Sequence, residues 1–149
     1  MRAAALCLIL WGGSVGAGAL ENCLVPCASE DCDMACFGLT ADVCAQSMPD
    51  TERDTTIGIS QCQVAEFEAW DGALNALWPS LRSYVAEQDI EDNLVDAQRA
   101  WIVFRDAECR FQTARWGMGT FRQIAWPACR AHLTAERVVA LRAVRREPN

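Results

Sequence analysis

Nine cysteines in a chain of 149 residues constrain the fold more than any other feature of this sequence. Such a cysteine content is typical of proteins that fold in an oxidising compartment, where thiols pair as disulfides, or of proteins that bind a metal ion. The first residues of the chain bear directly on the choice between these two classes.

Residues 1–19 have the three-part order of a secretory signal peptide. Arg2 supplies the positive start, an apolar stretch follows, and Ala17-Gly18-Ala19 matches the small-residue pattern of a cleavage site. The alternative is an N-terminal core helix of a cytosolic protein, which does not require this order. Cleavage after Ala19 would remove Cys7 and leave eight cysteines. We therefore expect an exported protein, periplasmic or secreted, with up to four disulfides and no membrane span.

Residues 20–45 form a Cys-rich N-terminal segment. It contains five of the remaining cysteines, namely Cys23, Cys27, Cys32, Cys36 and Cys44. Cysteines five residues apart lie on different faces of a continuous helix, so a turn near residues 29–31 is predicted. That turn would allow the nested disulfides Cys23–Cys36 and Cys27–Cys32. A four-thiolate metal site is the alternative, but C-x2-C spacing is commoner in such sites.

Helical spacing dominates the rest of the chain. Residues 46–58 are polar, contain Pro49 and Gly58, and are predicted to be a linker. Residues 59–146 are predicted to form a helical domain, because apolar residues recur at intervals of three to five. No segment of alternating β-branched residues competes with this pattern. The predicted fold class is all-α: a small, disulfide-braced, antiparallel helical bundle with a Cys-rich N-terminal extension.

The helix boundaries follow from caps and breakers. Ser60 is predicted to cap the first helix, with Gln63 completing a capping box, and Pro79 to kink or split that helix near residues 75–78. The second helix is expected over about 90–116 and the third over about 128–146, with Pro127 in its first turn. The predicted inner stripe of the second helix is Leu94, Ala97, Trp101, Phe104, Glu108 and Phe111.

Two more disulfides are consistent with these helices. Cys109 lies late in the second predicted helix and Cys129 early in the third, and the chain turns between them, so they can pair. Cys44 and Cys62 flank the linker and remain as the other pair. Cys109 also lies between Arg105 and Arg110, which could activate a thiolate, but a disulfide is the expected state in an exported chain.

The net charge of −7 is unevenly divided along the sequence. Residues 20–96 carry −14 and residues 97–149 carry +6. The helices can pair these charges across the bundle, or the acidic part can face a basic partner. The acidic balance disfavours nucleic acid as a partner, because phosphates attract Lys and Arg.

Catalytic chemistry is not indicated. His132 is the only histidine, no G-x-S-x-G or phosphate-binding loop follows a strand, and no C-x-x-C pair suits thiol exchange. We predict no catalytic residue, cofactor or metal site, and therefore no enzyme. Residues 97–109 mix aromatic and charged side chains, which could form either an interhelical ionic network or a recognition patch. We favour the ionic network, whose members would be Arg99, Arg105, Asp106, Glu108, Glu136 and Arg137.

The run Ala97-Gln98-Arg99-Ala100-Trp101-Ile102-Val103-Phe104-Arg105-Asp106-Ala107-Glu108-Cys109 resembles the signature of the lysozyme inhibitor LprI-like N-terminal domain family. The resemblance extends over about residues 44–141. The positions that match the family motif are Asn75, Gln98, Arg99, Trp101, Phe104, Arg105, Asp106, Glu108, Thr134 and Arg137. The resemblance implies a small exported helical domain braced by disulfides.

Two functions remain after these exclusions. The first is inhibition of a lysozyme, in which Asp50, Glu52 and Asp54 are candidate contacts to a basic protein partner. The second is an envelope interaction module with a different protein partner. A thiol-exchange enzyme ranks below both, and the sequence leaves the oligomeric state open.

Overall fold

The structure, a computed structural model, describes residues 15–146 of the chain, and most of the predicted signal peptide lies outside them. Within this part the chain is helical and has no strand, which confirms the all-α class. The helices are α1 (Val15–Leu24), α2 (Glu30–Met34), α3 (Leu39–Ser47), α4 (Asp50–Arg53), α5 (Thr56–Ala86), α6 (Glu91–Ala114) and α7 (Arg122–Arg146).

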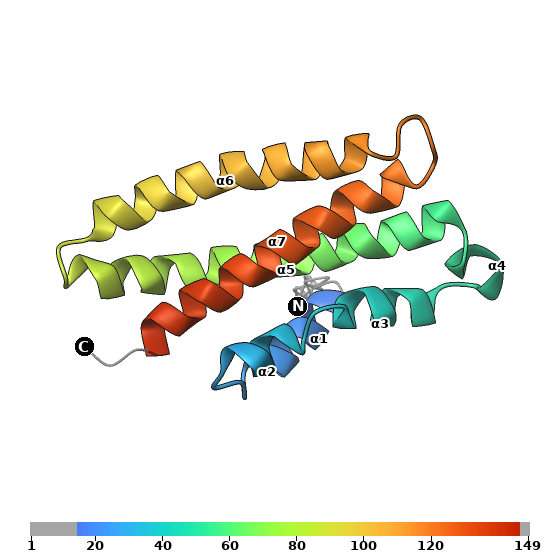
Figure 1. The fold of residues 1–149 in the computed structure, drawn as a ribbon. Coiled ribbons are helices and arrows are strands. Elements are labelled where there is room, and N and C mark those ends of the chain that lie inside the picture. The colour runs from blue at the N-terminus through green and yellow to red at the C-terminus, as the bar shows by residue number, and fades with distance from the viewer. Residues whose placement is uncertain (1–14, 147–149) are drawn as a thin grey trace, which may run out of the picture.

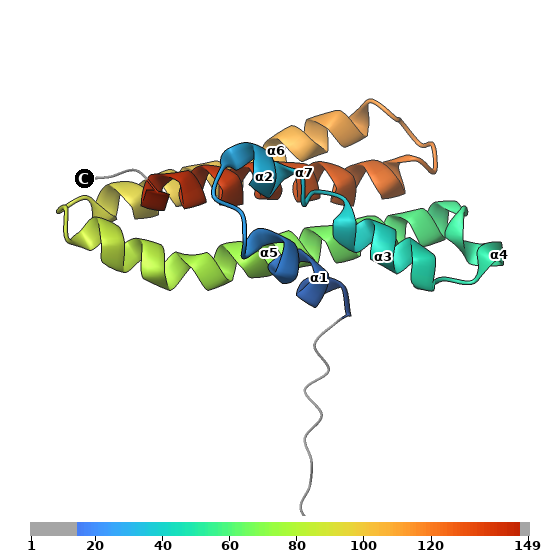
Figure 2. The same ribbon diagram turned by 90° about the horizontal axis from the view of Figure 1, so that it is seen from below.

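Three long helices form the body of the bundle (Figure 1). α5 and α7 pack along most of their length, and α6 packs more closely on α7 than on α5. The short helices α1, α2 and α3 lie together on the side of the bundle away from α6 (Figures 1 and 2). The core lies between these layers, where Trp70 and Leu81 of α5 meet Leu20 of α1 and Val138 of α7.

The segment expected to be a linker is mostly helical. Residues 46–58 contain the end of α3, all of α4 and the start of α5. α5 begins at Thr56 because the Thr55 hydroxyl accepts a hydrogen bond from Gly58 N at 3.0 Å, so the cap predicted at Ser60 is wrong. α5 also continues through Pro79 without a break. Pro79 lies on the exposed side of α5, where water can satisfy the carbonyl that loses its N–H partner.

The second proline is supported by a neighbouring helix. α7 begins at Arg122, so Pro127 lies in its second turn and not in its first. A proline at this position has no N–H to donate to the carbonyl of Gln123. The Ser60 hydroxyl of α5 donates to that carbonyl instead, with Oγ 2.8 Å from the oxygen. α5 therefore supplies the hydrogen bond that α7 cannot make within itself.

Replacing Ser60 by alanine is expected to lower the free energy of unfolding by about 1 kcal/mol, because the Gln123 carbonyl loses its donor. In a Pro127→Ala background, α7 regains its own N–H donor, and the same substitution should cost less. Urea unfolding of the four proteins, followed by circular dichroism, measures both costs. An equal cost in the two backgrounds would show that the hydroxyl does not replace the missing N–H.

The inner face of α6 is polar, and the stripe predicted for this helix is partly wrong. Its buried residues are Gln98, Arg105, Cys109 and Thr113, whereas Phe104 and Phe111 are 54% and 64% exposed. Leu94 and Trp101 do pack against the core as predicted. The inner face is thus rotated by about one residue, because Gln98 and Arg105 find hydrogen-bond partners on α7, which makes their burial tolerable.

Four disulfides brace the fold, and they are the four pairs considered from the spacing. Cys23–Cys36 and Cys27–Cys32 are nested and connect the end of α1 and the turn after it to α2 and the turn after α2. Cys44–Cys62 joins α3 to α5, and Cys109–Cys129 joins α6 to α7. The cysteines of the N-terminal segment are therefore used as disulfides and are not available as a four-thiolate metal site.

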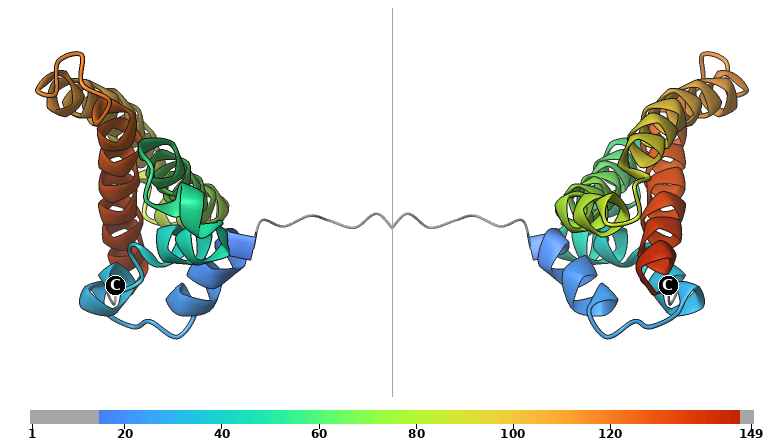
Figure 3. Two further views of the ribbon diagram at one scale, coloured as in Figure 1. Left: turned by 90° about the vertical axis from the view of Figure 1, so that its right-hand side faces the viewer. Right: turned by 90° about the vertical axis from the view of Figure 1, so that its left-hand side faces the viewer.

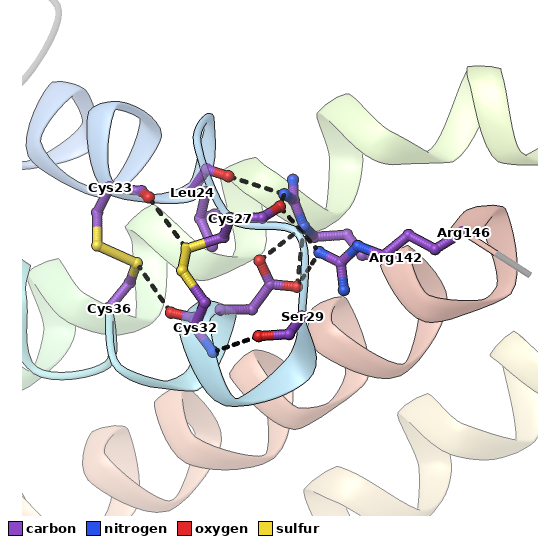
Figure 4. The surroundings of a disulfide bond; sticks show 9 residues. Cys23, Leu24, Cys27, Ser29, Cys32, Cys36, Arg142 and Arg146 are labelled. Atoms are coloured by element: carbon purple, nitrogen blue, oxygen red, sulfur yellow. Dashed lines mark hydrogen bonds and ion pairs between the residues drawn. A yellow bond between two sulfur atoms is a disulfide. The ribbon is translucent and has the colours of Figure 1, made fainter.

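An ion pair connects the Cys-rich segment to the last helix. The Asp33 side chain of α2 is completely buried, and Arg142 Nε of α7 lies 3.1 Å from each of its carboxylate oxygens. Arg146 pairs with the same carboxylate. Arg142 also donates to the Leu24 carbonyl at 2.8 Å, and Figure 4 shows both arginines extending from α7 toward the nested disulfides.

A buried carboxylate on α5 positions α3. Glu66 is 1% exposed, and its two oxygens accept hydrogen bonds from Gly38 N and Ala41 N, each at 2.8 Å. These N–H groups lie at the N-terminus of α3, where the helix dipole favours negative charge. Trp70 Nε1 donates to the same carboxylate at 2.7 Å. Glu66 therefore accepts hydrogen bonds both from the backbone N–H groups at the start of α3 and from the Trp70 indole in the core.

Candidate functional site

Half of the ten family-motif residues line a groove between α5 and α6. The groove has a volume of about 460 Å³. Five of the predicted positions line it: Asn75, Gln98, Arg99, Trp101 and Arg105. Trp78 and Arg82 of α5 lie on its other side. The groove is open because α6 packs mainly on α7 and leaves this flank of α5 exposed.

Arg105 is the central residue of this site. Its side chain is only 6% exposed, and its Nε donates to Asp106 Oδ1 at 3.0 Å. Nη1 lies 3.7 Å from Asp71 Oδ1 of α5 and 3.4 Å from Thr134 Oγ1 of α7. The guanidinium also lies 5.1 Å from the centre of the Trp101 ring. One charged side chain thus connects all three long helices, which supports the structural interpretation of the motif.

Two arginines of α7 extend the network. Arg137 Nε donates to Gln98 Oε1 at 2.9 Å. Arg130 lies 4.0 Å from the centre of the Phe67 ring and 3.6 Å from Asp106 Oδ1. Burial lowers the pKa of both guanidinium groups, and the charge of Arg105 lowers that of Arg130 further, while Asp106 and Asp71 raise it. The site therefore concentrates positive charge beside aromatic rings.

Several other residues singled out in the sequence lie outside this network. Arg99 is exposed and pairs with Asp96 of its own helix at 3.4 Å. Phe104 points to the solvent, and Glu108 accepts a hydrogen bond from Gln112 one turn later. Glu136 lies 3.3 Å from His132 on the surface of α7. The predicted ionic network thus forms only in part: Arg105 and Asp106 pair as predicted, Arg137 bonds to the neutral Gln98 side chain, and Arg99, Glu108 and Glu136 lie outside it.

The candidate partner contacts lie on a separate surface, the helix α4. Asp50, Glu52 and Asp54 are all exposed there. Arg53 anchors this helix, since its Nε donates to the Ala45 carbonyl at 2.8 Å and its Nη2 lies 2.9 Å from Asp50 Oδ1. α4 lies at one end of the bundle, beyond the end of α3 (Figures 1 and 2).

The close packing of α4 on α5 depends on a glycine. A Cβ atom at Gly58 would lie 2.2 Å from the Glu52 carbonyl oxygen, so only glycine allows this approach. The Thr55 hydroxyl adds a hydrogen bond to the same carbonyl at 2.8 Å. Cys44–Cys62 ties the preceding helix to α5. The three carboxylates are therefore carried on a short segment that is fixed at both ends.

Each cysteine of residues 18–146 is in a disulfide, so this part of the chain offers no free thiol. Within the same part, no group of three metal-ligating side chains comes together. None of the described helices is long and apolar enough to cross a membrane.

The sequence patterns did not indicate three carboxylates that connect one helix to another: Asp33, Glu66 and Asp71. Glu66 lies four residues before Trp70 and four after Cys62, inside the apolar stripe of α5. A carboxylate at such a position signals a buried acceptor, but its partners are backbone groups of α3, which no side-chain pattern reveals.

Comparison with known proteins gives one match. The model of the family described as lysozyme inhibitor LprI matches residues 44–141, which is more than half of the chain and includes α4 and the three long helices up to Leu141. No curated protein and no solved structure matches the chain. The Cys-rich segment before Cys44 lies outside the matched region.

Proposed function

Because the chain belongs to the lysozyme inhibitor LprI family, we propose that it is an exported protein that binds a lysozyme and blocks its activity. The four disulfides and the signal-peptide pattern of residues 1–19 support export to the periplasm or the medium. The observation that carries the proposal is the exposed acidic helix α4, held rigidly at one end of the bundle.

The chemistry of α4 suits a basic partner. Many lysozymes are strongly basic, and carboxylates on a projecting element attract such a surface and accelerate association. Because α4 is already fixed by Arg53 and by its contact with Gly58, little conformational entropy is lost on binding. In this mechanism Asp50, Glu52 and Asp54 contact basic side chains at the rim of the substrate cleft, and the body of the bundle covers the cleft.

The proposal predicts that neutralising α4 weakens inhibition. The triple variant Asp50→Asn, Glu52→Gln, Asp54→Asn keeps the side-chain shapes but removes three charges. We expect its inhibition constant for a basic egg-white lysozyme to rise about tenfold at low ionic strength. The measurement is the rate at which a cell-wall suspension loses turbidity, at increasing concentrations of inhibitor. Salt should weaken the wild-type inhibition more than that of the variant.

A matched control has the same net charge with α4 intact. The variant Glu21→Gln, Glu68→Gln, Glu136→Gln removes three exposed carboxylates elsewhere, and we expect it to inhibit within about twofold of the wild type. Equal losses in both variants would mean that only net charge matters and that α4 is not the contact. Undiminished lysis with excess wild-type protein would contradict the proposed function itself.

A further inference from the structure

The loop between α6 and α7, residues 115–121, carries large apolar side chains in solvent. Met118 is 91% exposed, Trp116 51% and Phe121 44%. The Trp116 and Phe121 rings lie 4.3 Å apart between centroids and form one apolar surface. Gly117, with a φ of 53°, and Gly119 let the chain turn here. The loop lies at a corner of the molecule far from α1 and α2 (Figure 3).

Arginines surround this apolar surface. Arg110, Arg115 and Arg122 are exposed, and Arg122 Nη1 lies 3.9 Å from Met118 Sδ. The sequence has no Asp or Glu from Cys109 to Ala135, whereas most of the acidic residues lie in the first two thirds of the chain. The acidic helix α4 is at the same end of the bundle but on the other side of α5 (Figure 1). The charge of the loop is therefore locally positive in an acidic protein.

We propose that these six residues, the arginine–aromatic tip (Arg110, Arg115, Trp116, Met118, Phe121 and Arg122), dock the protein on an anionic phospholipid surface. Tryptophan favours the interface between headgroups and acyl chains, and a fully exposed methionine can enter the acyl region. Guanidinium groups pair with lipid phosphates at the same depth. This function is additional to lysozyme binding and does not depend on it.

Two physical points favour lipid over a protein partner. The apolar side chains lie on a projecting loop, a shape that enters a soft headgroup layer but offers little area for a flat protein contact. The net charge of −7 does not prevent approach, because charges more than about 8 Å from the membrane surface are screened at physiological ionic strength. The local charge of the tip then decides the interaction.

Flotation with lipid vesicles tests this proposal. Protein purified after export, with its N-terminus read by mass spectrometry, is mixed with vesicles of phosphatidylglycerol and phosphatidylcholine or of phosphatidylcholine alone. We expect binding to the anionic vesicles only. Affinity should fall about fivefold for each arginine removed in Arg115→Gln and Arg122→Gln, and binding should weaken with salt. Met118→Ser should also weaken binding, and because Met118 is 91% exposed, this substitution leaves the packing of the bundle unchanged.

Matched controls separate the tip from general charge and apolar content. Val25→Ser removes another exposed apolar side chain and Arg145→Gln another exposed arginine, both outside the tip, and both should bind like the wild type. A vesicle-induced blue shift of tryptophan emission should disappear in Trp116→Phe. Absence of binding to anionic vesicles, or equal binding by tip and control variants, would overturn the proposal. Tip-dependent binding to a protein without vesicle binding would assign the surface to a protein partner and overturn it as well.

Discussion

Replacing Glu66 by alanine is expected to lower the free energy of unfolding by about 3 to 4 kcal/mol, a large part of the stability of a domain of this size. The substitution leaves three donors, Gly38 N, Ala41 N and Trp70 Nε1, without their acceptor in a buried region. It also removes negative charge from the N-terminus of α3. Urea unfolding followed by circular dichroism, with the disulfides intact, measures the loss.

Two further variants test whether the loss of stability comes from the Glu66 carboxylate itself. Glu66→Gln keeps the volume and one acceptor oxygen, so its cost should lie between those of wild type and Glu66→Ala. Glu68→Ala removes an exposed carboxylate from the same helix and should change the stability by less than about 0.5 kcal/mol. If Glu66→Ala and Glu68→Ala cost the same, the Glu66 carboxylate does not hold α3 in the way described.

The second large effect is expected at Asp33. Asp33→Ala should destabilise the protein by about 3 kcal/mol, because Arg142 and Arg146 lose a buried carboxylate. Those arginine side chains are 25% and 26% exposed, so water offsets part of the loss. We expect the loss of stability to be largest in residues 20–36, whose backbone amides should exchange hydrogen with solvent faster. The amides from Cys44 onward should keep their protection against exchange.

A double-mutant cycle isolates the ion pair. Asp33→Ala and Arg142→Ala together should cost at least about 1 kcal/mol less than the sum of the single costs. Asp31→Ala, which removes an exposed carboxylate of the same short helix, is the control and should show no coupling to Arg142. Additive costs for Asp33 and Arg142 would contradict the pairing.

The helical class and the disulfide pairs could be predicted because both depend on spacing along the chain. Cysteines five residues apart require a turn if they are to pair, and Ser29 does begin a new helix between Cys27 and Cys32. The motif in α6 could likewise be recognised from its residues. In each of these cases the information is local, within a separation of at most 20 residues along the chain.

The inner face of α6 and the start of α7 could not be predicted in this way, because they depend on contacts with residues that are distant in the sequence. The sequence pattern predicts Phe104 and Phe111 on the inner face because they are apolar, yet Arg105 lies on that face, since Asp71 and Thr134 pair with its guanidinium. α7 begins before Pro127, and the Gln123 carbonyl that Pro127 leaves without a helical donor accepts a hydrogen bond from the Ser60 hydroxyl of another helix. α4 is four residues long, too short for any periodicity to be detected in the sequence.

The connection of Asp33 to Arg142 and Arg146 also sets an order for folding. Each disulfide closes a loop of at most 20 residues, so these loops can form early and locally. The Asp33 carboxylate instead pairs with Arg142 and Arg146, which follow it by 109 and 113 positions in the sequence. The first hairpin can therefore be oxidised before α7 exists, and its α1 can pack on α5, but α2 can dock only after α7 has formed. A chain that has not yet formed its last helix would therefore hold an oxidised hairpin whose α2 has no docking partner.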